Sequence, residues 1–194
     1  MSKILVTDYI SGLVQLVNSD ELERIVAVPG GSELYFKTPY RGRMKVTETL
    51  AVLFAQQNTT LFDLGMILVT DSTKNLPMIL FVHNFDNVGV VQEKNQAATV
   101  IGSRIVQKGG MNNYVVSELI AAIYAQQKAG VNLGMNLLTR SSDGAPIVVM
   151  DQHINYIIDE VVSAVTTTYV VFKDTQGKIA VDEACAAIYG AQSA

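Results

Sequence analysis

Histidine and cysteine are the side chains of this chain best suited to catalysis or to binding a transition metal. His83 and His153 lie in separate segments, so a site that uses both requires the fold to bring them together. Asp86 and Asp151 are the nearby carboxylates that would complete such a site. Cys185 is flanked by alanines and has no basic neighbour to favour its thiolate, so we expect a small buried hydrophobe. One functional hypothesis is therefore an enzyme whose site is assembled from scattered residues around His83 or His153.

Motifs for common cofactors and nucleophiles are absent from the sequence. Neither the GxxxxGK[ST] phosphate loop nor the GxGxxG dinucleotide pattern occurs, and the nucleophile elbow GxSxG is missing. A single cysteine excludes an intrachain disulfide and every multi-cysteine zinc or iron–sulfur site. Two pairs of adjacent carboxylates, at 159–160 and 182–183, cannot flank one bond because neighbours on a helix point in different directions. No cofactor and no metal are expected.

One segment, residues 35–45, combines basic and aromatic side chains without any acid. The residues singled out as a contact surface are Lys37, Tyr40, Arg41, Arg43 and Lys45. Cations that follow a backbone and rings that stack on bases are what single-stranded nucleic acid binding requires. A solvated hairpin tip is the simpler interpretation. A third is contact with an acidic patch of a neighbouring copy, such as one near Asp159 and Glu160.

The composition is unusually poor in charge. Charged residues make up 16% of the chain and hydrophobic residues 49%, whereas an ordinary soluble domain has roughly 25% charged residues. Uncharged amides supply much of the polarity, with 11 asparagines and 11 glutamines. Charge depletion is typical of the centres of protein interfaces. The composition therefore favours a chain that binds copies of itself, with other structural subunits as further partners.

Net charge and hydropathy limit the remaining partners and the location. The net charge of −4 gives no overall electrostatic attraction to duplex DNA or to an anionic membrane. Apolar runs such as Met78–Val82 are strand-sized, and no signal peptide is evident, so neither a transmembrane nor a secreted protein is expected. With its lone cysteine, the chain suits the cytoplasm or a virion.

Hydrophobic periodicity predicts one α+β domain over residues 1–194, with a mainly antiparallel sheet and two or three helices packed on one face. No fixed-period repeat is apparent. The predicted helices are 9–17, 114–128 and an alanine-rich segment from an Asp182 cap to about Ala191. Residues 153–165 fit a strand by their β-branched residues and a helix by their apolar spacing, and we favour the helix. The predicted strands are 4–7, 24–28, 33–37, 44–54, 61–70, 77–82, 87–92, 136–139, 147–150, 166–173 and 178–181.

These observations together favour a non-enzymatic, self-assembling structural subunit of a shell, ring or tube, of the kind that forms a virus capsid or a phage tail. The preference depends on low charge, abundant amides, many strand edges and missing catalytic motifs. A single-stranded nucleic-acid binding module that uses the 35–45 segment is the second hypothesis.

Overall fold

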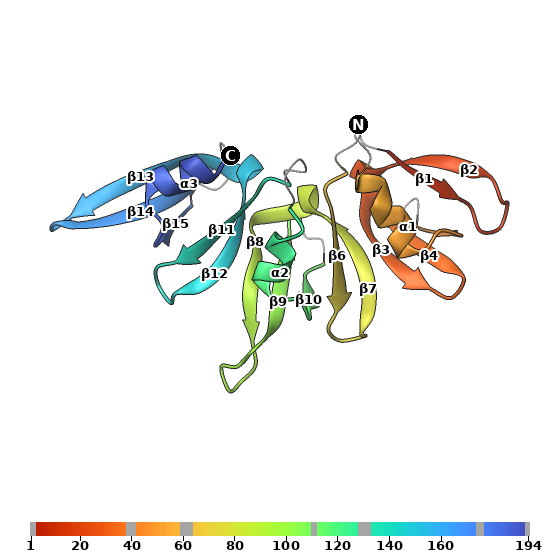
Figure 1. Cartoon of the computed structure of the whole chain (residues 1–194), viewed down its shortest axis with the longest axis horizontal. Helices are drawn as coiled ribbons and strands as arrows, with labels where there is room; N and C mark the ends of the chain where they lie inside the picture. Colours follow the sequence, from red (N-terminus) through yellow and green to blue (C-terminus); the bar gives the residue numbers. More distant parts are fainter. Residues whose placement is uncertain are drawn as a thin grey trace.

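The computed structural model describes residues 3–37, 42–58, 64–109, 112–127, 133–173 and 177–192. The chain is mostly antiparallel β-sheet with three short helices, arranged as an arched row of three units (Figure 1). Every unit has the same element order: a hairpin, a turn of 3₁₀ helix, a second hairpin, a short strand and an α-helix.

The bounds of the elements show how closely the three units match. Unit 1 contains β1 (Lys3–Thr7), β2 (Val14–Asn18), η1 (Ser19–Glu21), β3 (Leu22–Val28), β4 (Gly31–Phe36), β5 (Arg43–Val46), α1 (Leu50–Ala55) and η2 (Gln56–Asn58). Unit 2 contains β6 (Met66–Asp71), β7 (Leu76–Phe81), η3 (Val82–Asn84), β8 (Phe85–Lys94), β9 (Val100–Gln107), β10 (Tyr114–Val116) and α2 (Ile120–Tyr124). Unit 3 contains β11 (Met135–Arg140), β12 (Ala145–Met150), η4 (Asp151–His153), β13 (Ile154–Val162), β14 (Val165–Phe172), β15 (Lys178–Val181) and α3 (Cys185–Gln192).

Short sequence motifs recur in the three units, although the sequence shows no fixed-period repeat. The segment Ile4–Asp8 is identical to Ile67–Asp71, and Ala-Gln-Gln occurs at the carboxyl end of both α1 and α2. A glutamate before each helix accepts a hydrogen bond from a backbone N–H of the first strand of the same unit. The three bonds are Thr7 N to Glu48 Oε2 at 3.0 Å, Thr70 N to Glu118 Oε2 at 2.9 Å, and Thr139 N to Glu183 Oε1 at 2.9 Å. The expectation of no fixed-period repeat agrees with the uneven spacing of the units, whose first strands begin at Lys3, Met66 and Met135. The sequence similarity is confined to these motifs, and the loops between them differ in length.

Strands β3 to β15 form one continuous sheet across the three units, and β1 and β2 form a two-stranded sheet at its unit 1 end. Within a unit the spatial order is second, first, fifth, fourth and third strand, for example β7-β6-β10-β9-β8. In unit 1 the join between the first and fifth strands is the single bridge Asp8↔Val46, which matches Asp71↔Val116 in unit 2. Between units, β7 pairs with β3 and β12 pairs with β8, both antiparallel. The first hairpin of each later unit is therefore added to the sheet of the unit before it.

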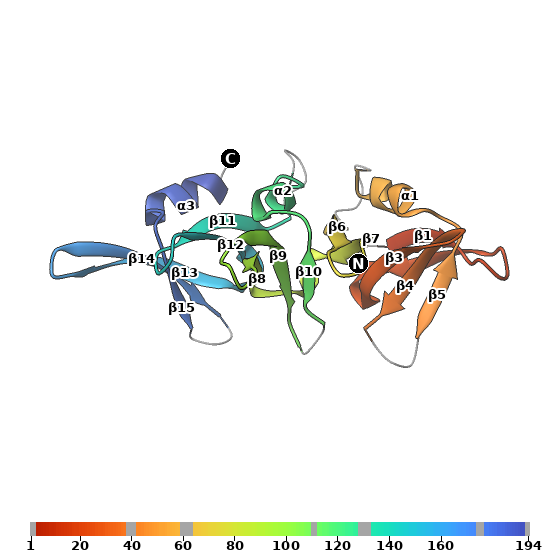
Figure 2. The ribbon, with the colours of Figure 1, turned by 90° about the horizontal axis from the view of Figure 1, so that it is seen from below.

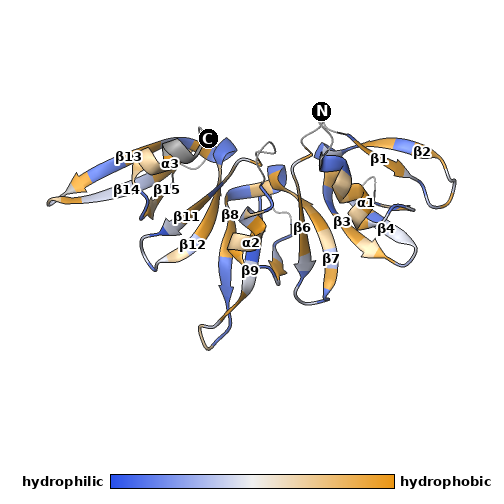
Figure 3. Ribbon diagram, in the orientation of Figure 1, coloured by the Kyte–Doolittle hydropathy of each residue, from blue (hydrophilic) through white to orange (hydrophobic). Residues whose placement is uncertain are grey.

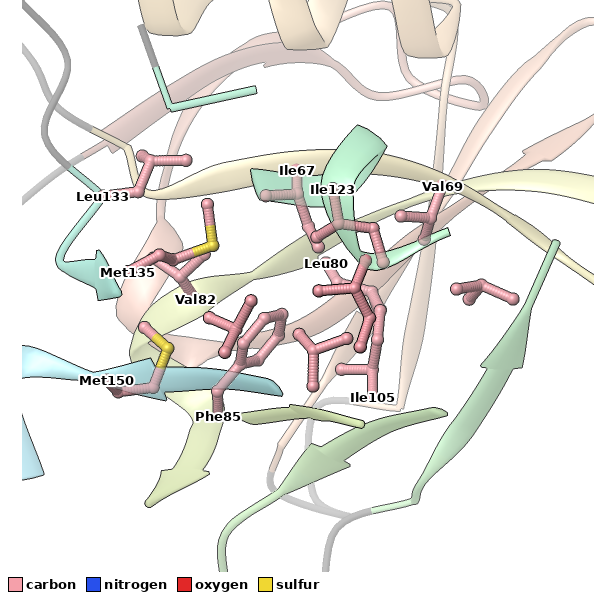
Figure 4. Packing of buried hydrophobic residues seen from close by; sticks show 14 of the residues in the cluster. Ile67, Val69, Leu80, Val82, Phe85, Ile105, Ile123, Leu133, Met135 and Met150 are labelled. Carbon is pink, nitrogen blue, oxygen red and sulfur yellow. The ribbon is translucent and has the colours of Figure 1, made fainter. Parts of the chain in front are cut away.

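The hydrophobic core is shared across these junctions. The cluster of unit 1 includes three buried side chains that belong to unit 2, namely Met66, Ile79 and Phe81. The cluster of unit 2 includes the side chains at the same positions of unit 3, namely Met135, Val148 and Met150. Figure 4 shows Met135 and Met150 lying beside Phe85 and Val82 of unit 2. Each of the first two cores is therefore completed by the hairpin that follows it.

The helices lie in a row along one side of the sheet (Figure 2). In units 1 and 2 a glycine near the start of the fourth strand lets the chain pass close to the fifth strand. A Cβ on Gly31 would lie 1.9 Å from the Val46 carbonyl oxygen, and one on Gly102 would lie 2.0 Å from that of Val116. This close approach holds the fifth strand against the fourth, immediately before the helix.

Several sequence predictions are confirmed and others are corrected. The hairpins around Gly30 and Gly144, the strands of the middle block, the pair β14–β15 and the closing helix are present. The helix predicted at 9–17 is wrong, because residues 14–18 form β2. The helix predicted at 153–165 is strand β13, and the one at 114–128 is strand β10 followed by the short α2. The strand predicted at 44–54 ends at Val46 and is followed by α1, where the Thr49 hydroxyl caps Val52 N–H. Strand β9 was not predicted.

Candidate functional site

The two ends of the sheet are the surfaces where the repeated packing stops. Strand β2 pairs only with β1 at one end of the described chain, and β13 pairs only with β14 at the other. In units 2 and 3 the strand equivalent to β2 is covered by the preceding unit. In units 1 and 2 the strand equivalent to β13 is covered by the following unit. Each end is therefore one half of a junction.

The free face of the β1–β2 hairpin is apolar. Leu5 is 50% exposed and Leu16 is 63% exposed, and the two lie directly opposite each other in the hairpin. The corresponding pair in unit 2 is Leu68 and Ile79, which packs into the core of unit 1. Ile79 is fully buried. Leu16 is therefore exposed at the position where Ile79 of unit 2 is buried between two units.

The other end carries the complementary half. Ile154 and Ile157 of β13 pack against the unit 3 core but are only partly buried. The residues at their positions in unit 1 are Leu22 and Ile25, and both are fully buried beneath the hairpin of unit 2. Among the side chains that the structure describes, the unit 3 cluster also has fewer buried members than the other two. The unit 3 core is therefore less covered on the side of β13 than the unit 1 core is on the side of β3.

Most of the exposed large apolar side chains that the structure describes gather at these two ends. At the first end they are Leu5, Tyr9, Ile10, Leu13, Val14 and Leu16, and at the second Tyr156, Ile158, Val161 and Val165. Hydrophobic stretches of β1 and β2 lie at one end of the arch, and the hydrophobic tip of β13 lies at the other (Figure 3). Contiguous exposed apolar surface of this kind marks a contact with another macromolecule.

Polar contacts accompany the two junctions inside the chain. The Gln127 side chain accepts a hydrogen bond from Met135 N–H at 2.9 Å and donates one to the Met135 carbonyl at 3.2 Å. Gln57, at the same position after α1, accepts one from Met66 N–H. Asn84 donates to the Leu22 carbonyl at 2.9 Å, and His153 Nε2, protonated in this contact, donates to the Phe85 carbonyl at 3.1 Å. A junction is therefore specified by hydrogen bonds as well as by apolar packing.

The segment predicted to contact nucleic acid or a neighbour lies at the β4–β5 hairpin of unit 1. Tyr40 and Arg41 fall outside the described residues. Arg43 lies 5.7 Å from the centre of the Tyr35 ring and 3.7 Å from Glu33, and Lys45 Nζ lies 3.7 Å from the centre of the Tyr9 ring.

Lys37 lies apart from these strand residues, just beyond the end of β4. Burial lowers the pKa of Lys37, and the positive charge of Lys108 lowers it further. The role predicted for the 35–45 segment stays a prediction.

The histidines do not form a shared site, because they lie at different junctions: His83 in η3 and His153 in η4. His153 is used in the contact with Phe85, whereas His83 Nε2 is buried with no partner among the described residues. Burial, with the charges of Lys37 and Lys108, lowers the pKa of His83 to about 4, so the ring is neutral at neutral pH. Within the described ranges, no three His, Cys, Asp or Glu side chains form a metal-binding group.

A cavity of about 190 Å³ lies between units 1 and 2, beside Arg24 and Tyr114. The Arg24 guanidinium lies 4.0 Å from the centre of the Tyr35 ring and is 2.6 Å from Glu23. The Tyr114 hydroxyl donates to the same Glu23 carboxylate at 2.5 Å, and burial raises the pKa of Tyr114. Arg24 and Glu23 therefore form an ion pair within unit 1, and the Tyr114 hydroxyl links unit 2 to that pair.

Comparisons of the chain with known protein families, with curated proteins and with solved structures find no match. Among the described residues, no helix has both the length and the apolar character needed to cross a membrane. Sequence reasoning missed the two ends because β2 was taken for a helix and β13 was assigned to one as well. The identical segments Ile4–Asp8 and Ile67–Asp71 are the signal that would have revealed the repeat.

Proposed function

We propose that the chain is a non-enzymatic structural subunit that assembles with copies of itself into a shell, ring or tube, such as those of virus particles and phage tails. The observation that carries the proposal is the pair of exposed apolar ends, β1–β2 and β13–β14, on a repeat whose internal ends are all covered. Low charge over the whole chain adds to it, because little electrostatic repulsion opposes close packing of copies.

The solution mass of the full chain tests this function. Light scattering over a range of protein concentrations should give a mass that exceeds the 21.0 kDa of one chain, and electron micrographs of the same sample should show particles of uniform shape. Assembly driven by apolar surface should persist in high salt, because salt screens charge but does not weaken apolar burial. A strictly monomeric chain at the highest soluble concentration would refute the proposal.

A further inference from the structure

We propose that copies join head to tail, with β2 of one copy pairing antiparallel with β13 of the next. This contact repeats between copies the junction that already joins the units within one chain. The inference rests on the proposed function and adds to it the partner surface, the strand direction and the register.

The two internal junctions share the register of two consecutive pairs, beyond which a shift between Val148 and Val149 alters the pairing in the second junction. Ile25 of β3 lies opposite Ile79 of β7, and Val90 of β8 lies opposite Val148 of β12. Ile25 and Val90 are equivalent, because each pairs with the matching residue of its own hairpin, Leu34 in unit 1 and Ile105 in unit 2. A register used twice in one chain is a property of the repeat rather than of one pair of strands.

The free strand β13 has the local geometry of β3. In β3 the pairing slips by one residue between Leu22 and Arg24, and in β13 it slips by one residue between Ile154 and Tyr156. Ile157 therefore occupies the position of Ile25, one residue after the bulge.

The position of Leu16 follows from the first hairpins. Leu5 lies opposite Leu16 in unit 1 exactly where Leu68 lies opposite Ile79 in unit 2. Leu16 consequently occupies the position of Ile79. The junction between copies places Leu16 opposite Ile157, Gln15 opposite Ile158 and Val17 opposite Tyr156.

This register completes the open core of unit 3. Opposed residues of an antiparallel pair project to the same face, so Leu16 and its neighbour Leu5 lie over Ile157 and the unit 3 cluster. Leu16, 63% exposed in the single chain, becomes covered like its counterparts Ile79 and Val148, which are fully buried. The sequence of α3 also preserves, in Gln192, the position that Gln57 and Gln127 hold after the first two helices.

The contact between copies differs from the internal junctions at polar positions. Lys3 and Asn18 stand where unit 2 has Met66 and Phe81, so the free hairpin is less apolar than the covered one. Glu21 stands where unit 2 has Asn84, and an ionised carboxylate cannot donate to a carbonyl as Asn84 does. These polar residues favour solvation of the β1–β2 hairpin before assembly. They also make the junction between copies weaker than the junctions inside the chain.

A contact between two different surfaces is heterologous. Each copy carries one β2 edge and one β13 edge, so each copy can bind two neighbouring copies. A two-fold dimer would instead use the same surface on both copies. Blocking one end of the chain therefore distinguishes the two arrangements.

Disulfide trapping tests the register. Two variants are prepared in a Cys185→Ser background, one with Gln15→Cys and the other with Ile158→Cys, and they are mixed under mild oxidation. The mixture should give a covalent dimer that neither variant gives alone. The matched control pairs Gln15→Cys with Asp159→Cys, whose side chain projects to the opposite face of the sheet, and should give none. Trapping in the control instead, or Gln15→Cys trapping with itself, would overturn the proposed junction.

End-blocking tests the direction of assembly. Leu16→Lys blocks the β2 end and Ile158→Lys blocks the β13 end, while Val52→Lys changes a similarly exposed side chain on α1 as a control. Each end-blocked variant alone should scatter as a monomer, their equimolar mixture as a dimer, and Val52→Lys as wild type. Self-association of either end-blocked variant overturns the head-to-tail arrangement while leaving the proposed function standing. A monomeric wild type removes both.

Discussion

Replacing Gln127 by alanine should loosen unit 3 from unit 2 without disturbing the interior of unit 2. The side-chain amide of Gln127 bridges the backbone N–H and carbonyl of Met135, the first residue of β11. The adjacent Gln126 makes the same pair of bonds, at 2.8 Å each, to Leu68 of β6 in its own unit. Two neighbouring residues of identical chemistry thus hold different strands.

The expected cost follows from the two bonds and from burial of their partner. Each hydrogen bond contributes about 0.5–1.5 kcal/mol, and an unsatisfied buried donor adds to the loss. Met135 is 2% exposed, so its N–H gains little from water when the glutamine is removed. The Gln127→Ala variant should therefore lower the free energy of opening β11 by about 2–3 kcal/mol.

Hydrogen exchange of individual amides measures this directly. A loss of about 2 kcal/mol speeds exchange through the affected opening by roughly 30-fold. In Gln127→Ala the acceleration should fall on Met135 and the amides of β11, and in Gln126→Ala on Leu68 and the amides of β6. Equal acceleration of both strands in both variants, or none at Met135, would refute the assignment of Gln127 to the junction.

Two further predictions concern His83 and the close glycines. With a pKa of about 4 in the folded chain and about 6.5 in the unfolded chain, His83 has no effect above about pH 6.5; as the pH falls from there, the unfolded chain binds the proton first and folding loses up to about 3 kcal/mol. Urea unfolding across that range should show a shallower loss of stability in His83→Phe than in wild type, and parallel curves would contradict it. Gly31→Ala and Gly102→Ala should each cost more than about 3 kcal/mol in the same assay, because the new Cβ meets a backbone oxygen. Gly144→Ala, at φ +64° with open space around it, should cost only about 1 kcal/mol, and equal losses at all three would rule out the steric account.

Turn residues and alternation were enough to place three hairpins, β3–β4, β6–β7 and β11–β12. Pro29-Gly30-Gly31 and Asp143-Gly144 mark chain reversals that need positive φ, and the strands on both sides follow from their β-branched residues. These signals depend only on residues adjacent in sequence, so they can be recognised without knowing which strands pair in the sheet.

The errors arose where apolar residues face something other than the core of their own unit. Ile10, Leu13 and Val14 imitate a helical stripe, but all three are exposed, and only Val17 of the predicted stripe enters the unit 1 core. Residues 153–165 carry apolar side chains on both faces of a strand, which single-sequence periodicity does not separate from a helix. The spacing was correct, but the assumption that all apolar residues pack inward was not.

The candidate contact residues of the 35–45 segment were chosen for their charge, whereas the junction halves at β2 and β13 carry little charge. Recognition of those halves requires comparison of each unit with the next, since only the buried state of Ile79 and Val148 gives meaning to the exposure of Leu16. The composition predicted a surface suited to contact between copies, but it did not predict which strands carry that surface.

Each chain contains three similar units, so the apparent symmetry of an assembly would differ from the symmetry given by its number of chains. In a closed assembly built through the β2–β13 contact, every chain supplies three similar units. A projection image at low resolution would then display a rotational order three times the number of chains. The true order would emerge only where the units differ, as in their helices, which span six residues in α1, five in α2 and eight in α3.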